Sequence, residues 1–345
     1  MMIRMLSFFS GIGAFEAALG NIGIDFELLG YCEIDKYASK SYSAIHGVPE
    51  SMNLGDITKI DEKSLPKDID LITYGFPCQD ISLAGKQKGL FNEDGTQTRS
   101  GLFFEALRII EETKPKVAIA ENVKNLVSNR FSEQFKIVLD SLEQAGYNNY
   151  WKVLDASNYN VPQSRERVFI VSIRKDVDTG VFEFPKPIKL TKKLEDYVDF
   201  REKDNLTNSF YNFYKKTKDS NATYEQFIDY VENLPIKENR IKSKDLGMYS
   251  FCEMNTITML SGICGTLTCR NVINYNKKFW YEQKLYRPSP KMCYRLQGFS
   301  DEDFENAKNV VDDTQLWKQA GNSITVDVLE ELFCMMFDED GELYI

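Results

Sequence analysis

The chain has 345 residues, enough for one large domain and a smaller one, and its net charge of −10 comes from 52 Asp and Glu against 42 Lys and Arg. Its seven cysteines include no Cys-x-x-Cys pair, which argues against a cysteine-built metal site and favours a reduced, cytoplasmic protein. No apolar run of about 18 residues occurs and the N-terminus has no long apolar segment, so we expect neither a membrane span nor a signal peptide.

Short apolar runs typical of buried strands alternate with helical patterns in the first half of the chain. Strands are predicted over 5–9, 28–32, 71–74, 117–120 and 168–173, and helices over 102–112 and 131–145, with an earlier helix ending at Leu19. This alternation indicates an α/β fold with a mostly parallel sheet.

The pattern changes after Pro185 and Pro187. Residues 190–290 are rich in Lys, Asn, Tyr and Thr and contain only brief apolar runs, such as 256–260. We therefore expect a smaller, irregular domain over 186–317, inserted into a larger domain made of 1–185 and 318–345. A last helix is predicted over 326–337, before an acidic tail.

Positive charge is concentrated in the irregular part of the chain. Residues 185–298 carry 20 Lys and Arg against 13 Asp and Glu, whereas the rest of the chain carries 22 against 39. A local charge of +7 favours a polyanion such as nucleic acid, although an ordinary lysine-rich surface would give the same count.

Cys78 comes shortly after the predicted strand 71–74. Ligands of open α/β sheets bind at the carboxyl ends of the strands, so a thiolate here is placed to meet a substrate; the alternative is a buried structural cysteine. Glu121 directly follows the next predicted strand and should reach the same crevice, which would pair a nucleophile with a carboxyl group. The only histidine, His46, lies in a loop-like sequence and is expected at the surface, which disfavours a Cys/His enzyme.

A second set of residues is typical of nucleoside binding. Gly11 and Gly13 form a turn after the first strand, Glu33 follows the second strand, and Asp56 follows a further presumed strand. The glycines would let a ligand approach the backbone, Glu33 would accept hydrogen bonds from a ribose diol, and Asp56 would bind an adenine amino group. Glu16 stands where a dinucleotide fingerprint has its third glycine, so a pyrophosphate is not required. Taken alone, each carboxylate is more often a solvated or capping group, and it is their order in the chain that favours a cofactor with a nucleoside.

Short motifs are spread over nearly the whole chain apart from about 190–260. In chain order they are Phe9-Ser10-Gly11-Ile12-Gly13, Glu33, Gly55-Asp56-Ile57, Gly75-Phe76-Pro77-Cys78-Gln79, Ser100-Gly101-Leu102-Phe103, Glu121-Asn122-Val123, Pro162-Gln163-Ser164-Arg165-Glu166-Arg167, Arg295-Leu296-Gln297-Gly298-Phe299 and Gln319-Ala320-Gly321-Asn322-Ser323. This ordered set resembles the DNA (cytosine-5)-methyltransferases of the bacterial and phage restriction-modification type. Ser7 and Ala14 depart from the Asp and Gly that many members carry, which affects the fine geometry of the glycine turn.

The resemblance implies a Rossmann-like S-adenosylmethionine-dependent methyltransferase domain and a small target-recognition domain. It implies methyl transfer from S-adenosyl-L-methionine, which becomes S-adenosyl-L-homocysteine, to C5 of a flipped-out cytosine in a specific short duplex DNA sequence. Cys78 would attack C6, Glu121 would hold N3 and the exocyclic amine, and Arg167 would bind the cytosine O2; Arg165 is the remaining catalytic candidate. The implied cofactor contacts are Phe9, Gly11, Ile12, Gly13, Glu33, Ile34, Asp56, Ile57, Gly75, Pro77, Leu102, Asn322 and Ser323, and the implied DNA contacts are Gln79, Ser82, Lys86, Thr266 and Leu267.

The polar segment 79–101 contains three glycines and would form a lid over DNA, the alternative being an ordinary variable loop. Two other functions stay open: a tRNA cytosine-5 methyltransferase and a catalytically silent DNA-binding regulator. The tRNA type usually carries Pro-Pro-Cys and Cys-Phe-Thr, which this sequence lacks, and intact Cys78 and Glu121 argue against a silent protein. We expect a monomeric, cytoplasmic and nucleoid-associated protein of a prokaryote or phage that binds double-stranded DNA. We expect no metal, and no stable complex with a cognate restriction endonuclease if one exists.

Overall fold

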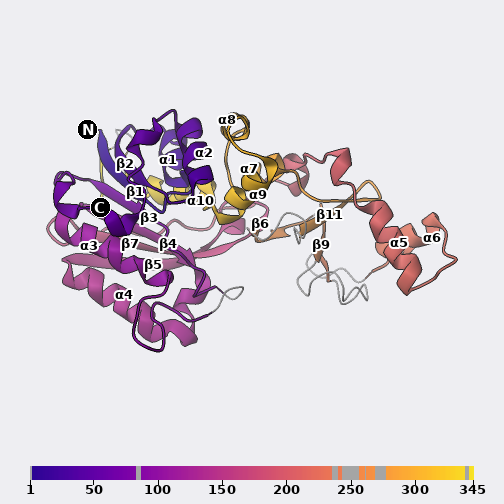
Figure 1. The fold of residues 1–345 in the computed structure, drawn as a ribbon, viewed down its shortest axis with the longest axis horizontal. Coiled ribbons are helices and arrows are strands. Elements are labelled where there is room, and N and C mark those ends of the chain that lie inside the picture. The colour runs from indigo at the N-terminus through magenta and orange to yellow at the C-terminus, as the bar shows by residue number, and fades with distance from the viewer. Residues whose placement is uncertain are drawn as a thin grey trace.

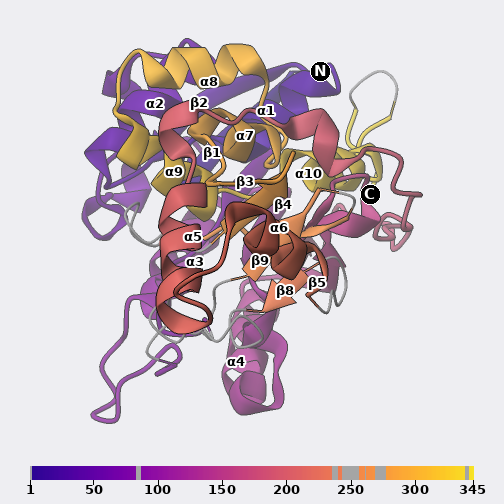
Figure 2. The same cartoon turned by 90° about the vertical axis from the view of Figure 1, so that its right-hand side faces the viewer.

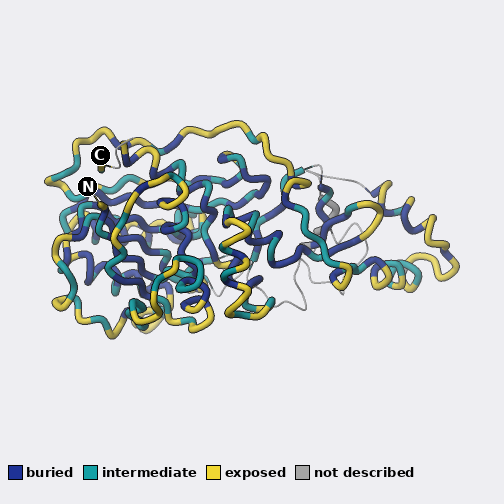
Figure 3. The backbone as a smooth tube through the Cα atoms, turned by 90° about the horizontal axis from the view of Figure 1, so that it is seen from above, coloured by how far each residue is buried: buried dark blue, intermediate teal, exposed yellow. Residues whose placement is uncertain are grey.

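The computed structural model describes residues 2–82, 87–234, 240–242, 256–260, 262–268, 277–338 and 342–345. Figure 1 shows a large α/β body from which a narrower region extends to one side. Buried backbone is concentrated in the large body, and exposed segments dominate the far end of the extension (Figure 3). Within the described ranges, no helix is long and apolar enough to span a membrane.

A six-stranded sheet with the order β2-β1-β3-β4-β7-β5 forms the centre of the large body. Its strands are β1 (Ile3–Phe8), β2 (Phe26–Cys32), β3 (Leu71–Tyr74), β4 (Val117–Val123), β5 (Tyr147–Asp155) and β7 (Glu166–Arg174). Strands β2, β1, β3 and β4 pair in parallel, whereas β7 is antiparallel to both of its neighbours, β4 and β5. The expected α/β fold with a mostly parallel sheet is therefore confirmed.

Helices cover both faces of this sheet. They are α1 (Ala14–Asn21), α2 (Lys36–His46), α3 (Phe103–Thr113), α4 (Ser132–Gln144), α7 (Pro290–Arg295), α8 (Asp301–Lys308), α9 (Asp313–Asn322) and α10 (Val326–Cys334). Consecutive strand residues point to opposite faces, so Met5 joins the apolar cluster that contains α1 and α10, whereas Leu6 joins the cluster that contains α3 and α4. The last helix returns to the first, with the rings of Phe15 and Phe333 in edge contact at 6.2 Å.

The extension contains a four-stranded sheet and a pair of helices (Figures 1 and 2). The sheet has the order β12-β11-β9-β8, with β8 (Arg240–Lys242), β9 (Thr256–Met259), β11 (Lys277–Tyr281) and β12 (Lys284–Tyr286), and the helices are α5 (Thr207–Thr217) and α6 (Tyr224–Glu232). Phe210, Phe227 and Trp280 belong to the small apolar cluster of this region. A separate pair, β6 (Gln163–Ser164) and β10 (Cys264–Gly265), joins the extension to the large body.

Short 3-10 segments connect these elements. They are η1 (Glu50–Met52), η2 (Ile57–Lys59), η3 (Glu62–Ser64), η4 (Ser100–Leu102), η5 (Lys124–Val127), η6 (Asn129–Phe131), η7 (Ala156–Asn158), η8 (Leu194–Tyr197) and η9 (Glu202–Asp204). Two local expectations were wrong. His46 is the last residue of α2 and half-buried, not a surface loop residue, and its Nε2 donates to the carbonyl of Ile12 at 3.0 Å. Asp56 follows η1 and an isolated bridge at Asn53, not a strand.

Helices α7 and α8 pack with the large body although they precede residue 318. Tyr294 on α7 and Phe304 on α8 belong to the apolar cluster of α1 and α10, and α8 lies against α2. We therefore propose that the extension ends near residue 288, about thirty residues before the expected boundary at 317.

Candidate active site

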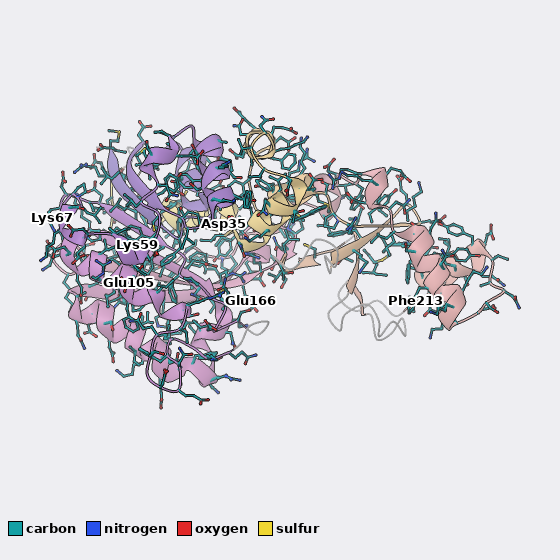
Figure 4. The ribbon with its side chains drawn as sticks, in the orientation of Figure 1. Asp35, Lys59, Lys67, Glu105, Glu166 and Phe213 are labelled. Carbon is teal, nitrogen blue, oxygen red and sulfur yellow. The ribbon has the colours of Figure 1, made fainter. Side chains whose placement is uncertain are left out.

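Glu33, Cys78 and Glu121 come from the carboxyl ends of three parallel strands, β2, β3 and β4. The chain passes from β1 to β2 on one side and then to β3 on the other, so the order of the sheet reverses between β1 and β3. Ligands of open α/β sheets bind at such a switch point. In Figure 4, Asp35 after β2 and Glu166 at the start of β7 lie on the side of the large body toward the extension, whereas Lys67, before β3, lies at the far end.

Glu121 lies inside β4 and not after it. Antiparallel pairing with β7 continues to Val123, whereas pairing with β3 stops at Ala120. The Glu121 carboxylate is therefore placed just where its parallel neighbour has ended. It pairs with Arg167, whose Nε lies 2.8 Å from Glu121 Oε1, and Glu121 Oε2 would be 3.6 Å from a Cβ added at Gly75.

Burial and positive charge act in opposite directions on this carboxyl group. Burial raises the pKa of Glu121 above its ordinary value, because the charged form is desolvated. The charges of Arg167 and Arg165 oppose this effect without cancelling it. A carboxyl group in this state is suited to donate a proton to a bound ligand.

Cys78 occupies a half-buried turn after β3. The amides of Ile81 and Ser82 both donate to the Cys78 carbonyl, at 3.0 and 2.7 Å. The residues around it are held from β4, because Asn122 Nδ2 donates to the carbonyl of Phe76 at 3.0 Å. Asn122 is buried and has no place among the predicted site residues, although it directly follows Glu121 in the motif.

Glu33 closes the turn after β1. Its Oε2 accepts the Gly11 amide at 2.9 Å and its Oε1 accepts the Asp35 amide at 2.7 Å. Burial raises the pKa of Glu33, and these amide hydrogen bonds oppose that rise. The backbone of Glu33 is held in turn by Asn53, whose Oδ1 accepts from the amides of Glu33 (3.0 Å) and Gly55 (2.9 Å).

Asn53 is thus a positioning residue that the sequence-based interpretation missed. The only local signal for it is an Asn two residues before a Gly, which is typical of an Asx turn. Asp56 lies next to that turn and caps η2. Its Oδ1 accepts hydrogen bonds from the amide (3.1 Å) and hydroxyl (2.9 Å) of Thr58, and these bonds lower the pKa of Asp56. Its second oxygen lies 3.9 Å from Lys59.

The remaining candidates near the glycine turn differ in exposure. Ile34 is 77% exposed, an unusual position for a large apolar side chain, whereas Ile12 and Ile57 are buried in the core. Phe9, Gly75, Pro77 and Leu102 are half-buried, and Phe9, Gly11 and Gly13 have positive φ angles of 52°, 58° and 80°.

The C-terminal motif reaches the same edge from the other end of the chain. Lys318 Nζ lies 2.5 Å from Asp35 Oδ2, and Gln319 Nε2 donates to the carbonyl of Tyr37 at 3.0 Å. Asn322 is exposed at the end of α9 and Ser323 is buried. The next residue, Ile324, approaches to 4.0 Å the position that a Cβ at Gly75 would take.

Three candidates are occupied by contacts within the protein. The Arg165 guanidinium donates to the backbone carbonyls of Leu267 (2.9 Å), Gly321 (3.2 Å) and Ser323. The Thr266 hydroxyl donates to the Ser164 carbonyl at 2.8 Å, and the Leu267 side chain is 1% exposed, so it presents no surface to DNA in this conformation.

The segment after Cys78 is docked on the start of α4. Leu90 N donates to Gln134 Oε1 at 2.5 Å, and Arg130 Nη2 donates to the Gln87 carbonyl at 3.1 Å. Gln79 is exposed and accepts from Arg99 at 3.3 Å, and Ser82 is half-buried. Lys86 lies outside the described residues. In the part of the chain that the structure describes, no three His, Cys, Asp or Glu side chains cluster as a metal site would require.

Comparisons with known proteins agree on one family. Residues 3–337 match the family of C-5 cytosine-specific DNA methylases. The type II methyltransferase M.HhaI of Haemophilus parahaemolyticus is 33% identical and covers 95% of this chain and 92% of its own. The type II methyltransferase M2.ScrFI of Lactococcus lactis subsp. cremoris is also 33% identical, with 97% and 99% covered, and the orphan methyltransferase M.SPBetaI of Bacillus phage SPbeta is 30% identical, with 96% of each covered. A crystal structure of S. pombe Dnmt2 methyltransferase has a TM-score of 0.65 over 96% of this chain and 97% of that one, at 19% identity, which shows the shared fold alone.

Proposed function

Because this chain belongs to the C-5 cytosine-specific DNA methylase family and is a DNA (cytosine-5-)-methyltransferase, we propose that it methylates C5 of a flipped-out cytosine within one short duplex sequence, by covalent catalysis through Cys78. The observation that carries this proposal is the Glu121–Arg167 pair at 2.8 Å, which lies beside Gly75. Gly75 is three residues before Cys78 in the chain. A thiol, a carboxyl group of raised pKa and a fixed guanidinium at one strand edge suit a nucleophilic attack on a pyrimidine ring.

The family is S-adenosylmethionine-dependent, and the residues after β1 and β2 fit that cofactor. A Cβ added at Gly11 would meet no atom of the described residues within 4 Å, so there is open space beside this turn. Glu33 presents carboxylate oxygens next to that space, and the exposed Ile34 offers an apolar face to a purine ring. When bound, the cofactor would supply an electrophilic methyl group on a sulfonium.

Each catalytic side chain then has a defined task. The Cys78 thiolate adds to C6 of the cytosine, and this makes C5 a carbon nucleophile. Glu121 donates a proton or a hydrogen bond to N3 and so stabilises the charge that develops there, while Arg167 orients Glu121 and binds the O2 oxygen. After C5 is methylated, a base removes its proton and the C6–sulfur bond breaks, which returns Cys78 to its starting state.

The extension is proposed as the DNA-recognition region. Its local positive charge favours phosphate contacts, and it projects from the side of the large body on which Asp35 and Glu166 lie (Figures 1 and 4). Substituting its exposed lysines should weaken DNA binding and flatten the salt dependence, with cofactor affinity nearly unchanged.

The chemistry is tested with duplex DNA that carries 5-fluorocytosine at the target, identified beforehand by bisulfite sequencing of plasmid from expressing cells. Fluorine replaces the proton that must leave, so a covalent protein–DNA adduct should persist on a denaturing gel when S-adenosylmethionine is present. Cys78→Ala should form no adduct while still binding DNA. Glu121→Gln should form it at least about a hundredfold more slowly, because an amide cannot donate the carboxyl proton.

Cys334 provides the matched control, because it is an exposed cysteine on α10. Cys334→Ala should form the adduct as the wild type does. An adduct that forms normally with Cys78→Ala would show that another residue is the nucleophile. Methyl transfer to tRNA with none to duplex DNA would refute the proposed substrate.

A further inference from the structure

Arg165 lies at the junction of three segments that are far apart in the sequence. It is 3% exposed, and its Nη1 donates to the carbonyl of Leu267 at 2.9 Å. Its Nη2 donates to the carbonyls of Gly321, at 3.2 Å, and Ser323. One planar guanidinium thus joins the segment that follows β10 in the extension to the end of α9.

Gln163, on β6 and two residues before Arg165, holds the same segment. Its Oε1 accepts the amide of Leu267 at 2.9 Å, and its Nε2 donates to the carbonyl of Leu296 at 2.9 Å. Both backbone groups of Leu267 are therefore bound by side chains of one short stretch, the amide by Gln163 and the carbonyl by Arg165. A displacement of this segment would have to break these bonds or move Arg165.

The other side of the guanidinium leads to the proposed cofactor site. Ser323 continues into Ile324, which approaches Gly75, and α9 is also held by the ion pair between Lys318 and Asp35, the residue that caps α2 after β2. Because a guanidinium donates in a rigid fork, carbonyls on its two sides are kept in a fixed relative position. Movement on one side is thereby transmitted to the other.

We propose that Arg165 is a positioning residue that couples DNA binding by the extension to cofactor binding at the end of α9. This inference rests on the proposed function, since it requires both ligands. It gives Arg165 a role distinct from that of Arg167, which contacts Glu121 directly. Coupling between two binding sites is reciprocal. DNA should therefore raise the affinity for S-adenosylhomocysteine by the same factor by which S-adenosylhomocysteine raises the affinity for DNA.

The test is calorimetric binding of S-adenosylhomocysteine to the full-length protein, with and without a duplex that contains the mapped target. For the wild type we expect DNA to tighten binding by at least about fivefold, the lower end of typical coupling. We call the affinity for S-adenosylhomocysteine with DNA divided by that without DNA the coupling ratio. For Arg165→Lys we expect this ratio to fall to about 2 or less, because an ammonium group cannot span carbonyls on both sides. The affinity of Arg165→Lys for S-adenosylhomocysteine in the absence of DNA should change by a smaller factor than the coupling ratio does.

Two further variants make the outcome decisive. Arg174→Lys is the matched control, because Arg174 also binds a backbone carbonyl, that of Lys114, but at the opposite end of β7; it should retain the wild-type ratio. Gln163→Met removes the hydrogen bond to the Leu267 amide without changing a charge, and it should also lower the coupling ratio. This variant provides the test if Arg165→Lys does not fold.

The proposal would be overturned if both Arg165→Lys and Gln163→Met kept the coupling ratio of the wild type. It would also be overturned if the wild-type protein bound both ligands with no coupling between them. A wild type that methylates DNA in either of these cases would leave the proposed function intact. A wild type that binds neither ligand and methylates no DNA would refute both.

Discussion

Gly13 occupies a position where the structure predicts an unusually large cost for one added methyl group. Its φ of +80° is in the left-handed region, and an added Cβ would lie 2.0 Å from His46 Nε2 and 2.9 Å from Tyr42 Cε2. Gly13→Ala should therefore cost about 1–2 kcal/mol for the backbone, and about 1 kcal/mol more when the His46 ring leaves its hydrogen bond with Ile12. The expected total is about 2–3 kcal/mol.

A double-mutant cycle separates the two contributions. In a His46→Ala background the ring is absent, so Gly13→Ala should cost about 1 kcal/mol less than in the wild type. Gly11→Ala is the matched control, since its φ is +58° but its Cβ would meet no described atom within 4 Å. The free energies of unfolding come from urea titrations followed by circular dichroism. An equal cost of Gly13→Ala in the two backgrounds, within about 0.3 kcal/mol, would refute the steric argument.

Two further predictions concern buried charges. Asp204 is 2% exposed and pairs with Arg201 (2.7 Å) and Arg287 (3.2 Å). Asp204→Ala should therefore lower the free energy of unfolding, measured by urea titration, by about 3 kcal/mol. Asp313→Ala removes a more exposed partner of Arg201 and should lower it by about 1 kcal/mol or less. Burial raises the pKa of Glu121 in the folded state, so the folded protein binds this proton more tightly than the unfolded chain and loses stability as pH rises from about 4.5 through the folded pKa. The stability of Glu121→Gln relative to wild type should therefore increase over that range, and a constant difference between pH 4 and 8 would contradict the raised pKa.

Several features of this protein are determined locally and were accessible from the sequence. The runs that became β1, β3, β4 and β7 are almost continuously apolar because these strands are buried on both faces of the sheet. Site residues that directly follow such strands could be located by the rule that ligands bind at their carboxyl ends. The order of the motifs indicated the family.

Other features depend on contacts between distant segments. β5 was missed because it is an edge strand whose polar residues, such as Asn148 and Lys152, are exposed, so it lacks a continuous apolar run. The expected domain boundary at 317 placed α7 and α8 with the irregular region, and only their packing against α2 and the main apolar cluster assigns them to the large body.

The environment of each site residue was decided in the same way. Motif order could identify Arg165 and Arg167 as a pair, but it could not show that one binds the Glu121 carboxylate while the other binds three backbone carbonyls. A residue type defines which hydrogen bonds a side chain is able to make. Which of them it makes depends on neighbours that lie up to 158 positions away in the chain, and these are brought together only by the tertiary fold.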